Sequence, residues 1–269
     1  MSEEQQLISD LGEVGVLDGI RWAYVSATDR VAEDYSEAAG HDATWAGITR
    51  FTLFRDRLDR VFNCLRYSVA KGGDGSVGLD LLNAELTERD IVTMPQLQSD
   101  LVNRADLNGS PGWAWGEWRW LLASSAYGKI DYIPWPQKSP TKQQVASQRN
   151  PEPLQPNLFE GFDEAEIAGL MIVGNPEFDL DRKTLVVAHA QDVDHDKREV
   201  VVGRPRLNVG GGLAWHWRHD LLTTPLSEGS RRLDDIPSLE GPSSVPDAPV
   251  RLRRRPNEQI SSEQASGDL

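Results

Sequence analysis

The stretch TLVVAHAQDVDHDKREVVV, residues 184–202, contains two β-branched runs on either side of a polar segment. Thr184–Ala190 and Glu199–Val202 have the composition of strands, and the Asp-rich segment between them is typical of a turn. A similar run, Gly169–Val173, comes earlier in the chain. We therefore expect residues 161–224 to form a small antiparallel β-sheet.

Nearer the N-terminus, apolar residues recur with helical spacing instead. Residues 17–38 and about 45–70 each carry one apolar stripe at intervals of three, four and seven. The polar break Gly40-His41-Asp42 separates the two stripes. These segments are expected to pack as an antiparallel helical hairpin.

Shorter helices are expected to follow the hairpin. One covers residues 79–86, and the next begins at Thr87, which can cap it together with Asp90 three residues on. A further helix is expected over residues 97–107. The whole region 1–133 is therefore predicted to be helical.

Proline interrupts regular structure in the middle of the chain, and the C-terminus has no hydrophobic period. Residues 134–160 are rich in proline, which favours a linker or surface strap. Residues 225–269 have the composition of a disordered tail. The predicted fold class is α+β, with a helical N-terminal region, a small antiparallel β-sheet and a disordered C-terminal tail.

Five of the nine tryptophans fall between Trp113 and Trp135. One interpretation is an aromatic platform for bases, sugars or a peptide, because each indole offers a stacking face and a donor. The favoured interpretation is a Trp-rich helix that seals the core, with Trp113, Trp120, Leu121 and Ser124 on one face.

Charge and composition exclude several classes of protein. The 269 residues carry a formal net charge of −14, and no apolar run is long enough for a membrane helix. The N-terminus is acidic and lacks a secretory signal, so a cytoplasmic, bacterial protein is expected. A lone cysteine, Cys64, excludes an internal disulfide or thiolate metal cage and is expected to pack as a small apolar residue.

The charge is unevenly distributed along the chain. Residues 1–42 hold ten carboxylates and two arginines, whereas residues 197–218 hold five basic residues and one acid. Such asymmetry allows a basic face to contact nucleic acid while the acidic face stays in water or meets a basic partner.

The basic segment interleaves guanidinium and indole groups. Arginine neutralises phosphates, and tryptophan stacks on bases without sequence preference. The predicted nucleic-acid-binding residues are Arg204, Arg206, Trp215, Trp217 and Arg218. In the alternative interpretation, these tryptophans belong to the core and the arginines pair with the acidic N-terminal region.

The Pro-rich segment ends in a short motif, Gln155-Pro156-Asn157-Leu158-Phe159. It resembles the bacterial sliding-clamp-binding pentapeptide, with an amide at one end and two apolar anchors at the other. Pro156 and Asn157 depart from the usual pattern. The resemblance implies that Gln155, Leu158 and Phe159 bind a sliding clamp; alternatively, the two apolar residues dock the strap onto the body.

The densest set of possible metal ligands is His189, Asp192, Asp194, His195 and Asp196. Lys197 stands where a calcium loop needs glycine, so an acidic hairpin turn is favoured over a metal site. His216 and His219 have the spacing of a helical pair. No motif for a nucleophile, a phosphate loop or a dinucleotide cofactor is present, and no catalytic residue, metal ligand or cofactor is assigned.

Three functions are consistent with these patterns. The first is a non-catalytic DNA-associated accessory protein in replication, repair or defence against foreign DNA. The second is a metal-dependent hydrolase or nuclease. The third is a protein-binding subunit of a larger complex, whose acidic face over residues 1–42 meets a basic partner.

Overall fold

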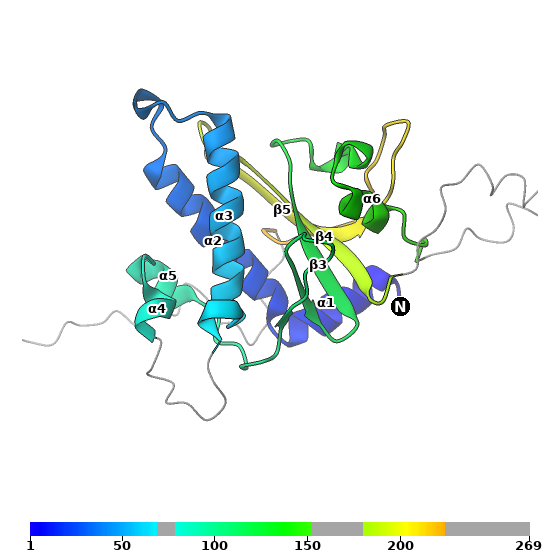
Figure 1. Ribbon diagram of the computed structural model, residues 1–269, viewed down its shortest axis with the longest axis horizontal. Helices are drawn as coiled ribbons and strands as arrows, with labels where there is room; N and C mark the ends of the chain where they lie inside the picture. The colour runs from blue at the N-terminus through cyan, green and yellow to red at the C-terminus, as the bar shows by residue number, and fades with distance from the viewer. Residues whose placement is uncertain (69–78, 152–179, 224–269) are drawn as a thin grey trace, which may run out of the picture. The chain divides into compact units, whose positions relative to one another are not determined.

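The computed structural model describes residues 1–68, 79–151 and 180–223, which combine helices with a six-stranded sheet (Figure 1). The predicted α+β class is confirmed. The run Gly169–Val173, the motif Gln155–Phe159 and the tail 225–269 lie outside the described residues. None of the helices in the described part of the chain has the length and apolar character needed to cross a bilayer.

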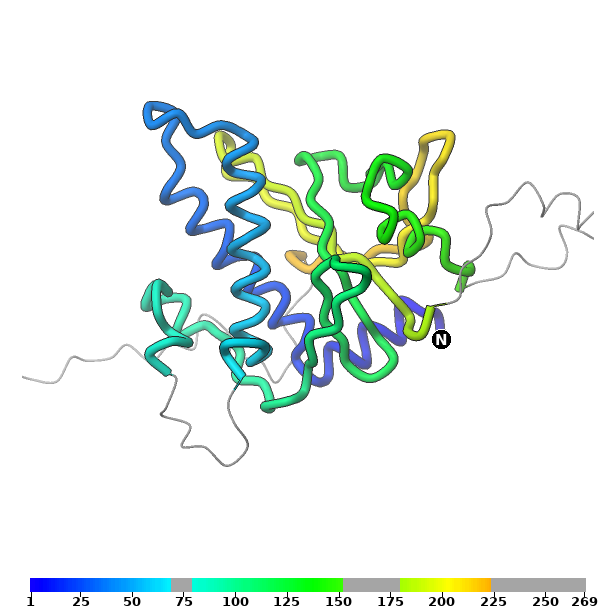
Figure 2. Tube along the Cα trace, in the orientation of Figure 1, coloured from blue at the N-terminus to red at the C-terminus, as the bar shows by residue number. Residues whose placement is uncertain are grey.

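The predicted helical hairpin is confirmed. Helices α2 and α3 pack side by side and are joined by the short 3-10 turn η1 (Figure 2). Asp42 caps α3 by accepting a hydrogen bond from the Trp45 N–H. Helix α3 ends before the predicted residue 70, because Asn63 adopts a left-handed backbone conformation at φ 51°. The bounds are α1 Glu3–Glu13, α2 Val16–Asp34, η1 Glu37–Ala39 and α3 Ala43–Val61.

Two short helices follow, α4 Leu79–Asn83 and α5 Glu88–Thr93. Thr87 and Asp90 form the predicted reciprocal cap at the start of α5. The prediction of a helix over residues 97–107 is wrong, since Asn103–Arg104 form strand β1. The backbone of this segment bonds to β2 instead, as when the Ala105 N–H donates to the Gly112 carbonyl.

The strands lie in the order β1-β2-β3-β4-β5-β6. All neighbours are antiparallel except β3 and β4, so the sheet is mixed and not purely antiparallel as predicted. A parallel pair needs a long crossover, and the described part of this crossover contains η3 Ile130–Tyr132, η4 Trp135–Gln137 and α6 Pro140–Ala146. The remaining strands are β2 Gly112–Trp115, β3 Trp118–Ser124, β4 Lys183–Asp192, β5 Lys197–Pro205 and β6 Trp215–Asp220.

Four of the five clustered tryptophans lie on β2 and β3, not on the predicted helix, and the fifth, Trp135, begins η4. Trp113 pairs with Trp120, and Trp115 pairs with Trp118 across a turn at Gly116-Glu117. The tryptophans stand at odd-numbered positions before this turn and at even-numbered positions after it. The spacing of two residues that is typical of a strand is therefore not continuous along the sequence. The favoured core role is nevertheless confirmed, since four of these side chains are at most 1% exposed: Trp113, Trp118, Trp120 and Trp135.

Apolar layers cover both faces of the sheet. Leu185 and Val187 pack against the helical hairpin, whereas Val186 and Ala188 pack against the segment that contains η3, η4 and α6. Figure 1 shows α3 and α6 on opposite sides of β3 and β4. Because both faces of β4 are buried, its central residues 185–188 form a continuous apolar run.

Candidate functional site

Arg204, the first predicted nucleic-acid contact, lies on β5 and is 7% exposed. Its Nη1 donates to Gln148 Oε1 at 2.8 Å, and its Nη2 lies 3.3 Å from Glu3 Oε1. The guanidinium therefore joins β5 to α1 and to the segment after α6. This matches the alternative in which arginine pairs with the acidic N-terminal region.

The two tryptophans of β6 also make contacts within the protein. Trp215 is 7% exposed, donates from Nε1 to the Ile130 carbonyl at 2.8 Å and packs edge-on against Trp135. Trp217 is half-buried and donates from Nε1 to Glu3 Oε2 at 2.8 Å. The buried face of Trp215 is not available for stacking on a base.

The remaining arginines differ from each other. Arg218 forms an ion pair with Asp131 at the surface, whereas Arg206 is exposed in the loop after β5. The five predicted residues therefore do not present one continuous stripe of guanidinium and indole groups. Nucleic-acid binding at these positions stays a prediction.

The possible metal ligands are divided between a strand and a turn. His189 is fully buried in β4, whereas Asp192 and His195 pair with each other at the β4–β5 turn, with 3.0 Å between His195 Nδ1 and Asp192 Oδ2. Across the ranges that the structure describes, no three His, Cys, Asp or Glu side chains are grouped to hold a metal ion.

His216 and His219 do not form the helical pair that their spacing suggested. Both lie on β6, where residues three apart point to opposite faces. Burial lowers the pKa of His216 to about 4, with help from the nearby charges of Arg206 and Arg204.

His189 lies within reach of a hydroxyl, which raises the question of nucleophilic catalysis. Its Nε2 is 3.3 Å from Ser124 Oγ, and its Nδ1 accepts a hydrogen bond from Arg50 Nε at 3.1 Å. Because Arg50 can only donate, the neutral imidazole carries its proton on Nε2 and donates to Ser124. A general base would need a free lone pair at Nε2, so this arrangement does not activate the serine.

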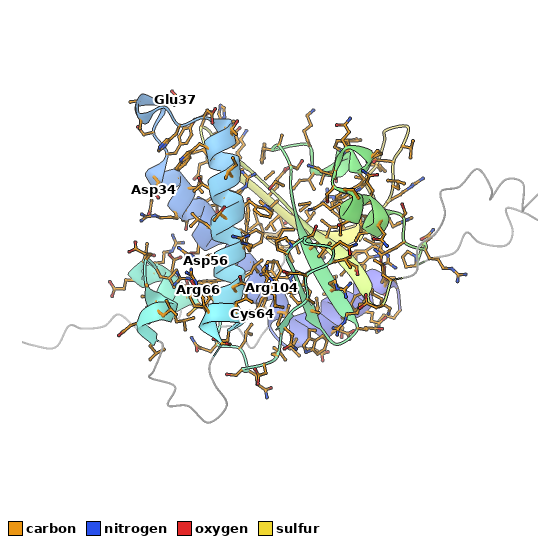
Figure 3. The ribbon with its side chains drawn as sticks, viewed as in Figure 1. Asp34, Glu37, Asp56, Cys64, Arg66 and Arg104 are labelled. Atoms are coloured by element: carbon orange, nitrogen blue, oxygen red, sulfur yellow. The ribbon has the colours of Figure 1, made fainter. Side chains whose placement is uncertain are left out.

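An acidic tip forms where the α2–α3 hairpin meets the β4–β5 turn. We define it by exposed carboxylates of residues 33–42 and 192–196, of which Figure 3 labels Asp34 and Glu37. The two segments are brought together near Tyr35, whose pKa is raised by partial desolvation and then by Asp194, Glu37 and Asp42. The tip consists of Glu33, Asp34, Glu37, Asp42, Asp194 and Asp196.

Part of the tip is neutralised and part is not. Arg30 pairs with Asp34 at 2.8 Å, and Arg198 pairs with Asp196 at 3.0 Å. Within the described residues Glu37, Asp42 and Asp194 form no ion pair. The tip therefore presents three carboxylates to solvent that no described basic side chain neutralises.

Aromatic rings lie among these carboxylates. The rings of His41 and Trp45 stack at a centroid distance of 3.9 Å with an interplanar angle of 3°, and the Tyr35 ring is 6.2 Å from each. All three side chains are half-buried. Sequence reasoning assigned Trp45 to the helical stripe and missed the cluster; the available signal was three aromatic residues within an acid-rich segment.

A polar cavity of about 350 Å³ lies beside the tip, between α2, α5 and the β4–β5 turn. Asp29 is central to it, since its two carboxylate oxygens pair with Arg198 and, at 3.6 Å, with Arg89. Glu33, Arg30 and Asp196 also line the cavity. Acidic and basic groups alternate here, so the cavity could accept a polar or charged side chain.

Comparison of the chain with family models, with curated proteins and with solved structures found no match.

Proposed function

We propose that this chain is a non-catalytic protein-binding subunit whose acidic tip docks a basic partner. The observation that carries the proposal is the convergence of Glu37, Asp42 and Asp194, which form no ion pair with any described residue, around a half-buried aromatic cluster. Two segments far apart in the sequence build this surface, and neither forms it alone.

The charge of the tip favours a partner rich in arginine or lysine. Uncompensated carboxylates attract a basic segment from a distance and raise its association rate, and they repel acidic competitors. The overall net charge of −14 acts in the same direction. Such attraction weakens as the ionic strength rises.

The aromatic rings supply the second part of the surface. Aromatic side chains are frequent binding hot spots because they bury a large area at a low cost in conformational entropy. An arginine stacked on Trp45 or Tyr35 would gain a cation–π contact and a carboxylate partner together. The stacked His41–Trp45 pair is already held in place by the Asp42 cap of α3.

The test compares two double variants with the same change in charge. Glu37→Lys/Asp194→Lys reverses two exposed carboxylates of the tip, whereas Glu13→Lys/Asp80→Lys reverses two exposed carboxylates elsewhere. A fluorescent Arg/Lys-rich peptide is titrated with each protein at low and moderate salt, and anisotropy is measured. We expect the tip variant alone to lose affinity, by up to about thirtyfold, because two exposed charge pairs each contribute up to about 1 kcal/mol and about 1.4 kcal/mol corresponds to tenfold.

Trp45→Ala provides a second measurement, which separates specific docking from general attraction between opposite charges. Loss of affinity in this variant supports an aromatic anchor. Equal affinity of both lysine double variants would remove the tip as the docking surface.

Association with DNA is our second proposal, and exposed Arg206 supports it. Arg206 lies close enough to His216 to lower its pKa, so a positive field exists at this end of the sheet. Arg206→Ala should weaken duplex binding and reduce its salt dependence. Unchanged affinity, measured by anisotropy at two salt concentrations, would argue against this site.

A further inference from the structure

His41 closes the turn between α2 and α3 through two hydrogen bonds to one residue. Its backbone N–H donates to the Ser36 carbonyl at 3.1 Å, and its ring Nδ1 accepts from the Ser36 N–H at 3.1 Å. Between these two residues, Gly40 adopts a left-handed conformation at φ 84°, and its N–H donates to the Glu37 carbonyl at 2.8 Å. The path of η1 therefore depends in part on the state of one imidazole ring.

The hydrogen bond to the ring fixes its protonation state. The Ser36 N–H can only donate, so Nδ1 of His41 must present a lone pair, and the neutral ring carries its proton on Nε2. A flipped ring would present the C–H group at Cδ2 to the Ser36 N–H and would offer no acceptor. Neutral His41 with its proton on Nε2 is therefore the form that the observed turn requires.

The ring is half-buried in the aromatic cluster of the acidic tip, so it is still accessible to protons from solvent. It lies flat on Trp45 at a centroid distance of 3.9 Å and is 6.2 Å from the Tyr35 ring. Carboxylates approach this cluster from three elements, and two of them act on Tyr35 from outside α3. They are Glu37 of η1, Asp42 at the start of α3 and Asp194 of the β4–β5 turn.

Protonation would change two properties of the ring. A protonated imidazole carries an N–H group at both nitrogens, so the proton on Nδ1 would point at the Ser36 N–H, and repulsion would replace the hydrogen bond. The ring would also become a cation, which the face of Trp45 and the nearby carboxylates attract. Protonated His41 would then occupy, from within the protein, the groups that an arginine of the partner would contact.

We propose that His41 is a pH-sensitive switch, whose protonation releases the turn at η1 and weakens the docking of a basic partner at the acidic tip. The docking half of this inference rests on the proposed function, whereas the release of the turn does not. Histidine side chains ordinarily change charge between about pH 5 and 8, where carboxylates keep most of their charge. The tip should therefore bind a basic segment at neutral pH and release it on mild acidification.

The first experiment follows the full chain without a partner, isotopically labelled, by NMR from about pH 7.5 to about pH 5.5. Ring-nitrogen spectra distinguish a nitrogen that carries a proton from one that accepts a hydrogen bond, and the variant His41→Asn identifies the His41 signals among those of the five histidines. We expect Nδ1 to be the acceptor at neutral pH, and the Ser36 amide signal to shift with the same midpoint as the His41 ring. Different midpoints, or a proton on Nδ1 at neutral pH, would overturn the proposal.

The second experiment titrates a fluorescent, histidine-free Arg/Lys-rich peptide at the same two pH values and compares variants that each lose one imidazole. His41→Asn keeps an acceptor, because Oδ1 of asparagine is as many bonds from Cα as Nδ1 of histidine, but this side chain does not titrate. His195→Asn is the matched control, because the His195 ring pairs with Asp192 at 3.0 Å in the β4–β5 turn.

We expect acidification to weaken peptide binding about two- to tenfold in the wild type and in His195→Asn, the range for one lost hydrogen bond. His41→Asn should lose much less affinity. An equal loss in both variants would overturn the docking half of the proposal. If the peptide binds none of these proteins at either pH, the proposed function and the docking half both fail, and the NMR titration alone decides whether His41 releases the turn.

Discussion

We expect the substitution of Asp56 on α3 to destabilise the fold more than the substitution of an exposed carboxylate. It accepts hydrogen bonds from Arg60 Nε at 2.8 Å, Arg66 Nη2 at 2.6 Å and the Tyr67 hydroxyl at 2.7 Å, and it pairs with Arg57 at 3.0 Å. Figure 3 shows Asp56 and Arg66 near the C-terminal half of α3. The substitution Asp56→Ala removes all four interactions.

The expected loss follows from what remains after the substitution. The side chains of Arg57 and Arg60 are only 3% and 5% exposed, so both would keep a buried charge without its carboxylate. Removal of one partner from a buried pair costs about 3–5 kcal/mol, and the 19% exposure of Asp56 favours the lower end. A loss of about 3 kcal/mol corresponds to about 6–12 °C in melting temperature for a domain of this size.

Asp34→Ala is the matched control. Asp34 pairs with Arg30 at 2.8 Å on the same helical hairpin, but both side chains are 41% exposed. Such pairs contribute about 0–1 kcal/mol. Urea unfolding followed by circular dichroism measures both variants. Equal destabilisation by Asp56→Ala and Asp34→Ala would refute the reasoning that burial of the arginines sets the cost.

The same carboxylate predicts a dependence on pH. Burial alone would raise the pKa of Asp56, but the hydrogen bonds from Tyr67, Arg60 and Arg66 outweigh it and lower the pKa. Its contribution to stability is therefore present above the unfolded-state value of about 3.9 and is lost as the pH falls through the folded-state pKa. The difference in unfolding free energy between wild type and Asp56→Asn should shrink below about pH 4.

Three further predictions concern the core. Gly203→Ala should destabilise the protein by about 1–3 kcal/mol, because a Cβ there would lie 2.5 Å from the Trp217 carbonyl oxygen. Gly210→Ala is the control, since its Cβ would meet nothing within 4 Å, and equal melting temperatures of the two variants would contradict the prediction. His189 has a lowered pKa, so its neutral form contributes stability that is present above about pH 6.5 and declines as the pH falls toward the folded-state pKa. His189→Gln should flatten the loss of stability measured by urea unfolding between pH 7 and 5, and an unchanged slope would assign that loss to other groups. Burial raises the pKa of Cys64 to about 12, so a thiol reagent should label it only after denaturation; rapid labelling of the native protein would show that the site opens.

Local signals predicted several elements correctly. The helical hairpin follows from two apolar stripes with a period near 3.6, and the cap at Thr87 follows from a spacing of three residues. Helical spacing failed over residues 113–124, because tryptophans on two strands joined by a tight turn imitate it. The spacing of three residues between His216 and His219 likewise suggested a helix, although both residues lie on strand β6.

The sequence predicted less of the candidate sites. The acidity of residues 1–42 was visible, but its convergence with Asp194 was not. Arg204 was predicted to be a surface residue that binds nucleic acid, whereas it is buried and contacts Glu3 and Gln148. Such pairings join residues far apart in the chain, and no local pattern records them.

The sequence by itself determined where helices and strands form in the hairpin and in residues 184–202, because these depend on neighbours within a few turns or residues. Only the tertiary structure decided that β3 and β4 run parallel, that the sheet is mixed and that Arg50 of α3 donates to the buried His189 of β4. The physical reason is that side-chain periodicity specifies which face of an element is buried, whereas the partner that covers this face is set by packing across the whole fold.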